Sequence, residues 1–113
     1  MSLVTKRIEA VIRRERVSDV KLALAEVPHQ DFTACDTAEH DPKSETVVQY
    51  RCTSCVVDMT PRVRISFLVD DDVAVIAVRS ILGAARTGRE GDGTVVVSPV
   101  EEVLDISSAA VLT

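Results

Sequence analysis

Residues 87–103 read TGREGDGTVVVSPVEEV, and this stretch decides how the second half of the chain is interpreted. Gly88, Gly91 and Gly93 fall within six residues, and the apolar run 95–97 follows almost at once. Glycine adopts positive φ readily and lets backbone N–H groups approach an anion. The stretch therefore predicts a helix end, a Gly-Asp-Gly turn and a buried strand. The turn has two interpretations: an ordinary helix-to-strand turn, or a cradle for phosphate.

Hydrophobic periodicity predicts the elements on either side of this stretch. We expect strands over 7–13, 32–36, 45–51, 62–69 and 94–98, helices over 17–27 and 73–86, and a short element over 103–106. Pro28 should close the first helix, and the aspartates 70–72 should cap the second. The order β-α-β-β-α-β predicts a single α+β domain over residues 1–113 with a ferredoxin-like fold.

The composition fits one small domain with an aliphatic core. The chain has 113 residues, of which 46% are hydrophobic, 3% are aromatic and none is Trp. A core of this size often gains stability from oligomerisation. The sequence contains no apolar run long enough to cross a membrane and no pattern typical of a secretory leader. We therefore expect a cytoplasmic protein without direct membrane insertion, whose three cysteines are mainly reduced.

The net charge of −5 argues against nucleic acid as a partner, because nucleic-acid binding needs a basic surface. Most of the acidity is local. Residues 29–60 contain six acidic and two basic side chains, which gives −4 for this segment. The segment is interpreted either as a solvated acidic loop or as a loop that faces a protein partner.

Four stretches of the chain resemble the PII signal-transduction family. Residues 87–103 closely resemble its nucleotide-holding B-loop, 7–13 its first strand, 20–27 its first helix, and 56–65 the end of its long T-loop with the strand that follows. The match runs without gaps over roughly residues 4 to 106. The resemblance implies a trimeric ferredoxin-like protein with a T-loop at about 37–58 and a B-loop at about 86–94.

The resemblance also implies a function. PII proteins are homotrimers that bind adenine nucleotides between subunits, usually with 2-oxoglutarate, and contact transporters and enzymes through the T-loop. We therefore expect a regulatory protein rather than an enzyme, acting in nitrogen or carbon metabolism on a transporter or enzyme target. It is similar to a divergent branch of carbon-regulating PII-like proteins, some of which are linked to bicarbonate uptake or carboxysomes.

Some nucleotide-site residues carry over from the family by position. The phosphate-holding residues of the B-loop correspond to Gly91, Asp92 and Gly93, and the adenine-side threonine corresponds to Thr33. Val11 and Leu68 correspond in kind to apolar adenine contacts. Arg62 replaces a lysine that reads the 2-oxoglutarate carboxylate; it keeps the charge but changes the geometry.

Other site residues depart from the family pattern. The Gly-Phe-Gly-Arg-Gln motif at the base of the T-loop is Glu-His-Asp-Pro-Lys at 39–43. The lysine that ends the B-loop is Thr94, and two phosphate-clamping arginines are Asp105 and Ser107. Each lost charge-assisted hydrogen bond removes about 1.5–3 kcal/mol. We therefore expect no tightly bound cofactor and a preference for AMP or ADP over ATP as effector.

The tip of the T-loop differs as well. It reads YRCTSC at 50–55, so Cys55 stands where many family members carry a modifiable tyrosine. Cys52 and Cys55 can form a disulfide or supply half of a zinc site, or they have no assigned role. An alternative function is therefore a PII-fold scaffold that responds to redox state or metal without sensing nucleotides. A thiol-disulfide oxidoreductase is disfavoured, because such enzymes place the motif at a helix N-terminus.

The remaining cysteine and the histidines are assigned structural or solvent-exposed positions. Cys35 lies in a predicted strand and is interpreted as a small core residue. His29 and His40 are interpreted as solvated loop residues. Their spacing relative to the cysteines fits no zinc template.

Overall fold

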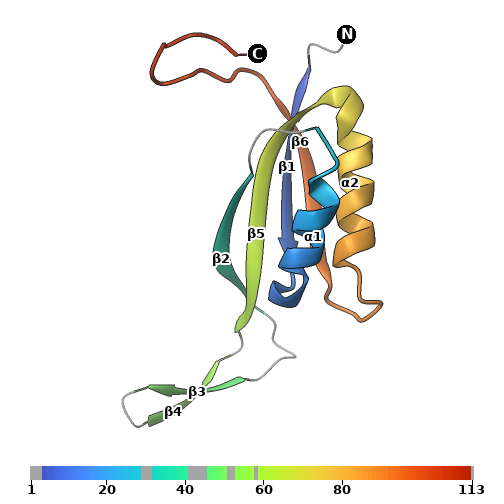
Figure 1. Ribbon diagram of the computed structural model, residues 1–113. Coiled ribbons are helices and arrows are strands. Elements are labelled where there is room, and N and C mark those ends of the chain that lie inside the picture. Colours follow the sequence, from blue (N-terminus) through green and yellow to red (C-terminus); the bar gives the residue numbers. More distant parts are fainter. Residues whose placement is uncertain (1–3, 29–31, 41–45, 51–52, 58, 113) are drawn as a thin grey trace.

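The computed structural model describes residues 4–28, 32–40, 46–50, 53–57 and 59–112, with only the backbone described over 46–57. Its elements are β1 (Thr5–Ile12), the short 3-10 helix η1 (Arg14–Arg16), α1 (Val17–Leu24), β2 (Thr33–His40), β3 (Thr46–Tyr50), β4 (Thr53–Val57), β5 (Met59–Asp70), α2 (Asp71–Ala85) and β6 (Gly93–Val100). Four of the strands form one antiparallel sheet in the order β2-β5-β1-β6. The predicted ferredoxin-like α+β fold is confirmed (Figure 1).

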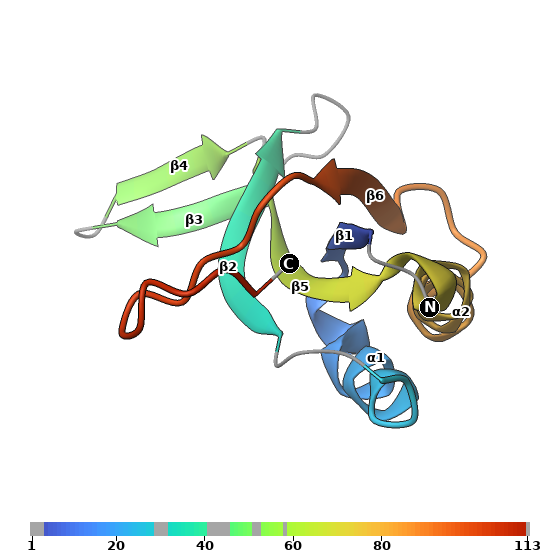
Figure 2. The ribbon, with the colours of Figure 1, turned by 90° about the horizontal axis from the view of Figure 1, so that it is seen from above.

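Both helices cover the same face of this sheet, as Figures 1 and 2 show. The strands bury aliphatic residues towards the helices at every second position, for example Ile8, Ala10 and Ile12 of β1. The helices add Val20, Leu24, Ala74, Ala77, Ile81 and Ala85 to this core. The small residues of α2 let the helix approach the sheet closely. In the described part of the single chain, no helix covers the opposite face of the sheet, here called the open face.

The open face carries the other half of each strand. Because side chains alternate along a strand, Arg7, Glu9 and Val11 of β1 share this face with Arg64, Ser66 and Leu68 of β5. In the antiparallel register Val11 pairs with Arg64 on one side and with Thr94 of β6 on the other. The open face is therefore a mixture of charged, polar and aliphatic groups.

The strands β3 and β4 form a separate two-stranded hairpin that stands away from the main sheet (Figure 1). The Cα radius of gyration is 17.0 Å, compared with about 13 Å for a compact domain of this length. The longest dimension is 55 Å, against 34 and 22 Å for the other two. The hydrophobic periodicity predicts β3 but not β4, because residues 53–57 alternate only weakly.

Three further expectations are corrected. Cys35 is exposed on β2, because it lies on the open face; its sulfur accepts a hydrogen bond from Arg64 at 3.5 Å. Asp70 occupies the N-cap position of α2, as expected, but its side chain makes no capping hydrogen bond; the N–H of Asp71 donates to the carbonyl of Val4 at 2.9 Å. Residues 103–106 form no strand of their own, and Leu104 makes one isolated bridge to Val111.

The histidine expectation is corrected in part. His40 is exposed, as predicted, but lies at the end of strand β2 rather than in a loop. His29 lies outside the described residues.

Candidate functional site

The connection between α2 and β6, the predicted B-loop, has a backbone that requires glycine. Gly88, Gly91 and Gly93 have φ values of 85°, 84° and 122°. A side chain at Gly93 would place Cβ 1.9 Å from the carbonyl oxygen of Val11. Gly93 pairs with Ile12 in the β1–β6 ladder, so the missing side chain is what lets this loop enter the sheet.

The carboxylate of Asp92 holds the first half of this loop in place. It accepts hydrogen bonds from the backbone N–H of Thr87 at 2.8 Å and of Gly88 at 3.1 Å, and another from the Thr87 hydroxyl. Arg13 donates from Nε to the same carboxylate at 2.9 Å. The Thr87 hydroxyl and the Arg13 guanidinium hold the pKa of Asp92 well below its usual range. Asp92 therefore stays ionised while the loop is formed.

The second half of the loop is bracketed by two arginines. Arg13 donates from Nη2 to the carbonyl of Glu90 at 3.0 Å, and Arg62 donates from Nη2 to the carbonyl of Gly91 at 2.5 Å. The C=O and the N–H of one trans peptide unit point in opposite directions, so the contact of the Glu90 carbonyl with Arg13 leaves the N–H of Gly91 pointing away from that arginine. In the described part of the chain, the N–H groups of Glu90 and Gly91 have no hydrogen-bond acceptor. These two donors are available to an anion.

Arg62 is a buried cation beside the loop. The residue is 6% exposed, and its Nε lies 3.3 Å from a carboxylate oxygen of Glu39. Of these residues, the resemblance to the family assigns only Arg62 to the site, and Glu39, Arg13 and Thr87 enter it from the structure. Arg13 could have been found, because it lies two positions after Val11 and therefore on the same face of the strand. The contact of Glu39 with Arg62 depends on the pairing of β2 with β5, so no local pattern in the sequence indicates it.

The predicted nucleotide-site residues fall into two groups within one chain. The structure brings Val11, Arg62, Gly91, Asp92 and Gly93 together, and these residues are here called the B-loop group. Thr33 and Leu68, here called the distal group, lie farther along the sheet. Thr33 pairs with Ser66, four residues from Arg62, and Leu68 is six residues from it. At about 3.3 Å per residue these separations are roughly 13 and 20 Å.

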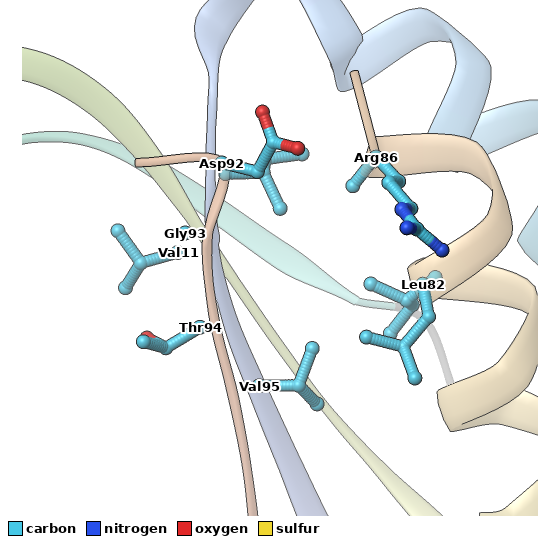
Figure 3. Close-up of a pocket in the computed structure, with 10 residues that line it drawn as sticks. Val11, Leu82, Arg86, Asp92, Gly93, Thr94 and Val95 are labelled. Atoms are coloured by element: carbon cyan, nitrogen blue, oxygen red, sulfur yellow. The ribbon is translucent and has the colours of Figure 1, made fainter. Parts of the chain in front are cut away.

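A pocket of about 330 Å³ lies behind the loop, between α2 and the ends of β1 and β6. In Figure 3, Leu82 and Arg86 point from α2 towards this space and Val95 points into it from β6. Val11 and Thr94 point away to the opposite side of the sheet (Figure 3). The pocket is therefore on the helix side, and its wall is mainly aliphatic. Three residues of the B-loop group, Val11, Asp92 and Gly93, also line the pocket.

Three residues that stand where the family pattern has a lysine or an arginine lie outside the B-loop group: Thr94, Asp105 and Ser107. Thr94 is exposed on β6, next to Gly93. Asp105 lies in the C-terminal segment, where its carboxylate accepts hydrogen bonds from the N–H of Ser108 at 3.0 Å and from the Ser108 hydroxyl at 3.3 Å. Ser107 belongs to the same turn.

The cysteine motif at the hairpin is only partly described. Cys55 lies in β4, where it pairs with Val48 of β3, and Cys52 lies outside the described residues. The disulfide therefore stays a prediction. The described residues contain no group of three or more acidic, histidine or cysteine side chains placed to hold a metal ion. Nor do they include a helix long and apolar enough to cross a membrane.

Comparison with known proteins identifies the family. The sequence profile of the family described as Nitrogen regulatory protein P-II matches residues 5–109. The chain belongs to this family. The Nitrogen regulatory protein P-II of Azospirillum brasilense is 38% identical over 101 residues, which are 89% of this chain and 90% of that protein. The corresponding protein of Nostoc punctiforme is 32% identical over the same shares of the two chains.

A solved structure supports the fold independently. The crystal structure described as Arabidopsis thaliana PII bound to citrate superposes with a TM-score of 0.74. The alignment covers 96% of this chain and 88% of the plant chain, at 22% sequence identity. The fold is therefore that of a PII protein.

Proposed function

We propose that this chain is a regulatory protein, not an enzyme, that senses adenine nucleotides and controls a partner protein through the β3–β4 hairpin. The observation that carries the proposal is the B-loop group. Its glycine-dependent backbone is locked by Asp92, and two peptide N–H groups remain without acceptors in the described structure, beside a buried arginine. This arrangement suits phosphate oxygens, which accept from backbone N–H groups and arginine.

The proposed effector is AMP or ADP rather than ATP. Around the loop, Arg13 is paired with Asp92 and Arg62 with Glu39, so the two cations are already opposed by two carboxylates. Each further phosphate adds negative charge that needs a cation or a donor. Thr94 and Ser107 offer hydroxyl groups and Asp105 offers a carboxylate. The shorter nucleotides therefore lose least from these substitutions.

The proposed assembly is a homotrimer with nucleotide sites between subunits. By family position Thr33 and Leu68 belong to the adenine end of the site, and we propose that a neighbouring chain supplies them to a nucleotide whose phosphates lie at the B-loop group. The C-terminal segment also favours a neighbour. It exposes four large apolar side chains in the single chain, and Ile106 is 99% exposed. Exposed apolar clusters of this kind mark interaction surfaces.

The proposed output element is the β3–β4 hairpin. It pairs only with itself among the sheets of the described structure, and it projects from the end of the sheet at which β2 leads out and β5 begins (Figure 1). Glu39, near the end of β2 that leads out towards the hairpin, contacts Arg62 of the same chain. The base of the hairpin therefore lies next to the B-loop group. We propose a transporter or enzyme of nitrogen or carbon metabolism as target, and the cytoplasm as location.

The test is calorimetric titration of the reduced protein with AMP, ADP and MgATP, each with and without 2-oxoglutarate. The proposal expects binding of AMP or ADP and weaker binding of MgATP that 2-oxoglutarate does not strengthen. Light scattering on the same sample should give about three times the chain mass of 12.3 kDa. Absence of binding for all three nucleotides would reject nucleotide sensing. Tight binding of MgATP that depends on 2-oxoglutarate would reject the preference.

A further inference from the structure

The charges around the B-loop group are balanced by the chain itself. Two guanidinium groups, Arg13 and Arg62, donate to consecutive carbonyls of the loop. Each also faces one carboxylate: Asp92 at 2.9 Å from Arg13 Nε, and Glu39 at 3.3 Å from Arg62 Nε. An incoming anion therefore meets a neutral site, although two arginines lie beside it.

The two carboxylates are held very differently. Asp92 accepts from two backbone N–H groups, one hydroxyl and one guanidinium, and its side chain is 23% exposed. Among the described residues the Glu39 side chain makes a single ion pair, with Arg62, and it is 42% exposed. Loss of Asp92 would release the loop, whereas Glu39 can turn towards solvent and leave the hydrogen bonds within the loop intact. Glu39 is thus the carboxylate that can be displaced.

The contact of Glu39 with Arg62 is also incomplete. Although Arg62 is 6% exposed, its Nε has no hydrogen bond of good geometry in the described structure. The hydroxyl of Thr60, which pairs across the strands with Glu39, is a second buried polar atom without a hydrogen-bond partner among the described residues. A buried polar group without a hydrogen bond lowers the stability of the folded state. The side of Arg62 that faces Glu39 therefore retains binding capacity for a better-placed acceptor.

We propose that Glu39 is a specificity-determining residue that acts as a built-in competitor for Arg62. In this structure the Glu39 carboxylate neutralises the buried guanidinium. A ligand anion can bind Arg62 only if it displaces the Glu39 carboxylate, so weakly charged or monodentate anions are rejected. The ligand class that can succeed is a compact polyanion with several oxygens, such as a diphosphate group. The inference rests on the proposed use of the B-loop group as an anion site, and not on recognition of adenine.

The experiment compares inorganic pyrophosphate binding to the wild type, Glu39→Gln and Glu26→Gln by calorimetry at fixed ionic strength. Glu39→Gln keeps the shape of the side chain and removes its charge. Glu26→Gln changes the net charge of the chain equally, at an exposed position beyond the end of α1. We expect Glu39→Gln to bind pyrophosphate about tenfold more tightly, as one freed charge-assisted contact implies. Glu26→Gln should match the wild type.

The gain should also depend on Arg62. In the double variant Glu39→Gln/Arg62→Gln, the tenfold gain should vanish, provided that melting curves show a folded protein. Equal pyrophosphate affinity of Glu39→Gln and Glu26→Gln would overturn the proposal. So would a gain that survives in a folded double variant. A parallel ADP titration separates the two claims: no ADP binding in any variant would reject nucleotide sensing, while the pyrophosphate comparison still decides the role of Glu39.

Discussion

The B-loop and the β3–β4 hairpin are both excursions from the same sheet, but they are fixed in opposite ways. The B-loop is fixed both by itself and by the main domain: its own Asp92 holds its start, Arg13 and Arg62 hold its middle, and Gly93 enters the sheet against Ile12. The hairpin pairs its two strands with each other and lies outside the four-stranded sheet. One loop is pre-organised by the domain, and the other is organised only by itself.

This difference indicates that the B-loop is suited to binding a ligand and the β3–β4 hairpin to signalling to a partner protein. A pre-organised loop offers fixed donors to a ligand without losing conformational entropy on binding. A hairpin with few contacts to the domain can change its direction at low cost. The ion pair of Glu39 with Arg62 lies between the two regions, because Glu39 is the last residue but one of β2. Substitutions in each region test this contrast, starting with the largest expected effect.

The sharpest prediction for the B-loop is the effect of Gly93→Ala. The new Cβ would lie 1.9 Å from the Val11 carbonyl oxygen, at a φ of 122° that alanine rarely adopts. Either the loop or the β1–β6 pairing must shift, which should lower the free energy of unfolding by about 3 kcal/mol or more. Urea unfolding measures this. An unchanged midpoint would show that the loop is not fixed as described.

Gly83→Ala is the matched control. Gly83 lies within α2, and a Cβ there would meet no atom within 4 Å. Alanine in a helix interior should raise the free energy of unfolding by about 0.5–1 kcal/mol. Opposite signs for the two glycine substitutions would confirm that position in the fold, and not loss of glycine itself, decides the outcome.

Asp92→Asn should loosen the loop less severely and change its pH dependence. The pKa of Asp92 is lowered in the folded chain, so its contribution to stability is present above the unfolded value of about 3.9 and is lost as pH falls from there towards the folded value. Thermal unfolding between pH 7 and pH 3 should show a lower melting temperature for the Asp92→Asn variant at neutral pH. The gap to the wild type should shrink towards pH 3. A gap that does not depend on pH would contradict the ionised network.

For the hairpin, the expected effect on the domain is small. Replacing residues 46–57 by a short Gly-Ser linker removes β3 and β4 and leaves the four-stranded sheet intact. The free energy of unfolding should stay within about 0.5 kcal/mol of the wild type. ADP binding should persist, while capture of the target protein should be lost. A large loss of stability would show that the hairpin supports the domain after all.

The smallest expected effect on the domain comes from oxidation of the hairpin tip. Cys52 and Cys55 are predicted to form a reversible intrachain disulfide, because two intervening residues allow the Cα separation of roughly 4.4–6.8 Å that a disulfide needs. Mass spectrometry after mild oxidation should show loss of two hydrogens, reversed by reductant. Cys55→Ser is the control and should not change mass in this way. Melting of the domain should be the same in both redox states, and resistance of both thiols would reject the switch.

The extent to which the sequence predicted the structure follows the same contrast between the two regions. Glycine spacing and alternation located the B-loop and the strands around it, because both are local properties of the chain. β4 was missed because residues 53–57 alternate weakly and include polar residues. Cys35 was assigned to the core because an edge strand of an open sheet has the same local pattern as a buried one.

Non-local contacts limited the prediction of the site. Glycine spacing indicates the loop, and the resemblance to the PII family assigns Gly91, Asp92 and Gly93 to the site. The partners that fix the loop, Arg13 and Arg62, are 77 and 29 residues from the carbonyls that they bind. Nothing in residues 39–43 taken alone indicates that Glu39 reaches a buried arginine. Such contacts follow from strand pairing, so they need the fold before they can be seen.

The most direct test of the account asks whether the B-loop group and the distal group complete one nucleotide site across two chains. Gly91→Asp places a carboxylate in the B-loop group, and Thr33→Glu places one in the distal group. Each variant alone should form trimers that fail to bind ADP.

Trimers assembled from an equal mixture of the two variants should regain ADP binding at about one quarter of the wild-type stoichiometry. Only an interface that joins an intact B-loop group to an intact distal group is complete, and random assembly around a ring makes about one interface in four of that kind. Calorimetry of the refolded mixture gives the number of sites. Recovery near one quarter is the predicted result, and no recovery in mixed trimers would contradict a site shared between chains.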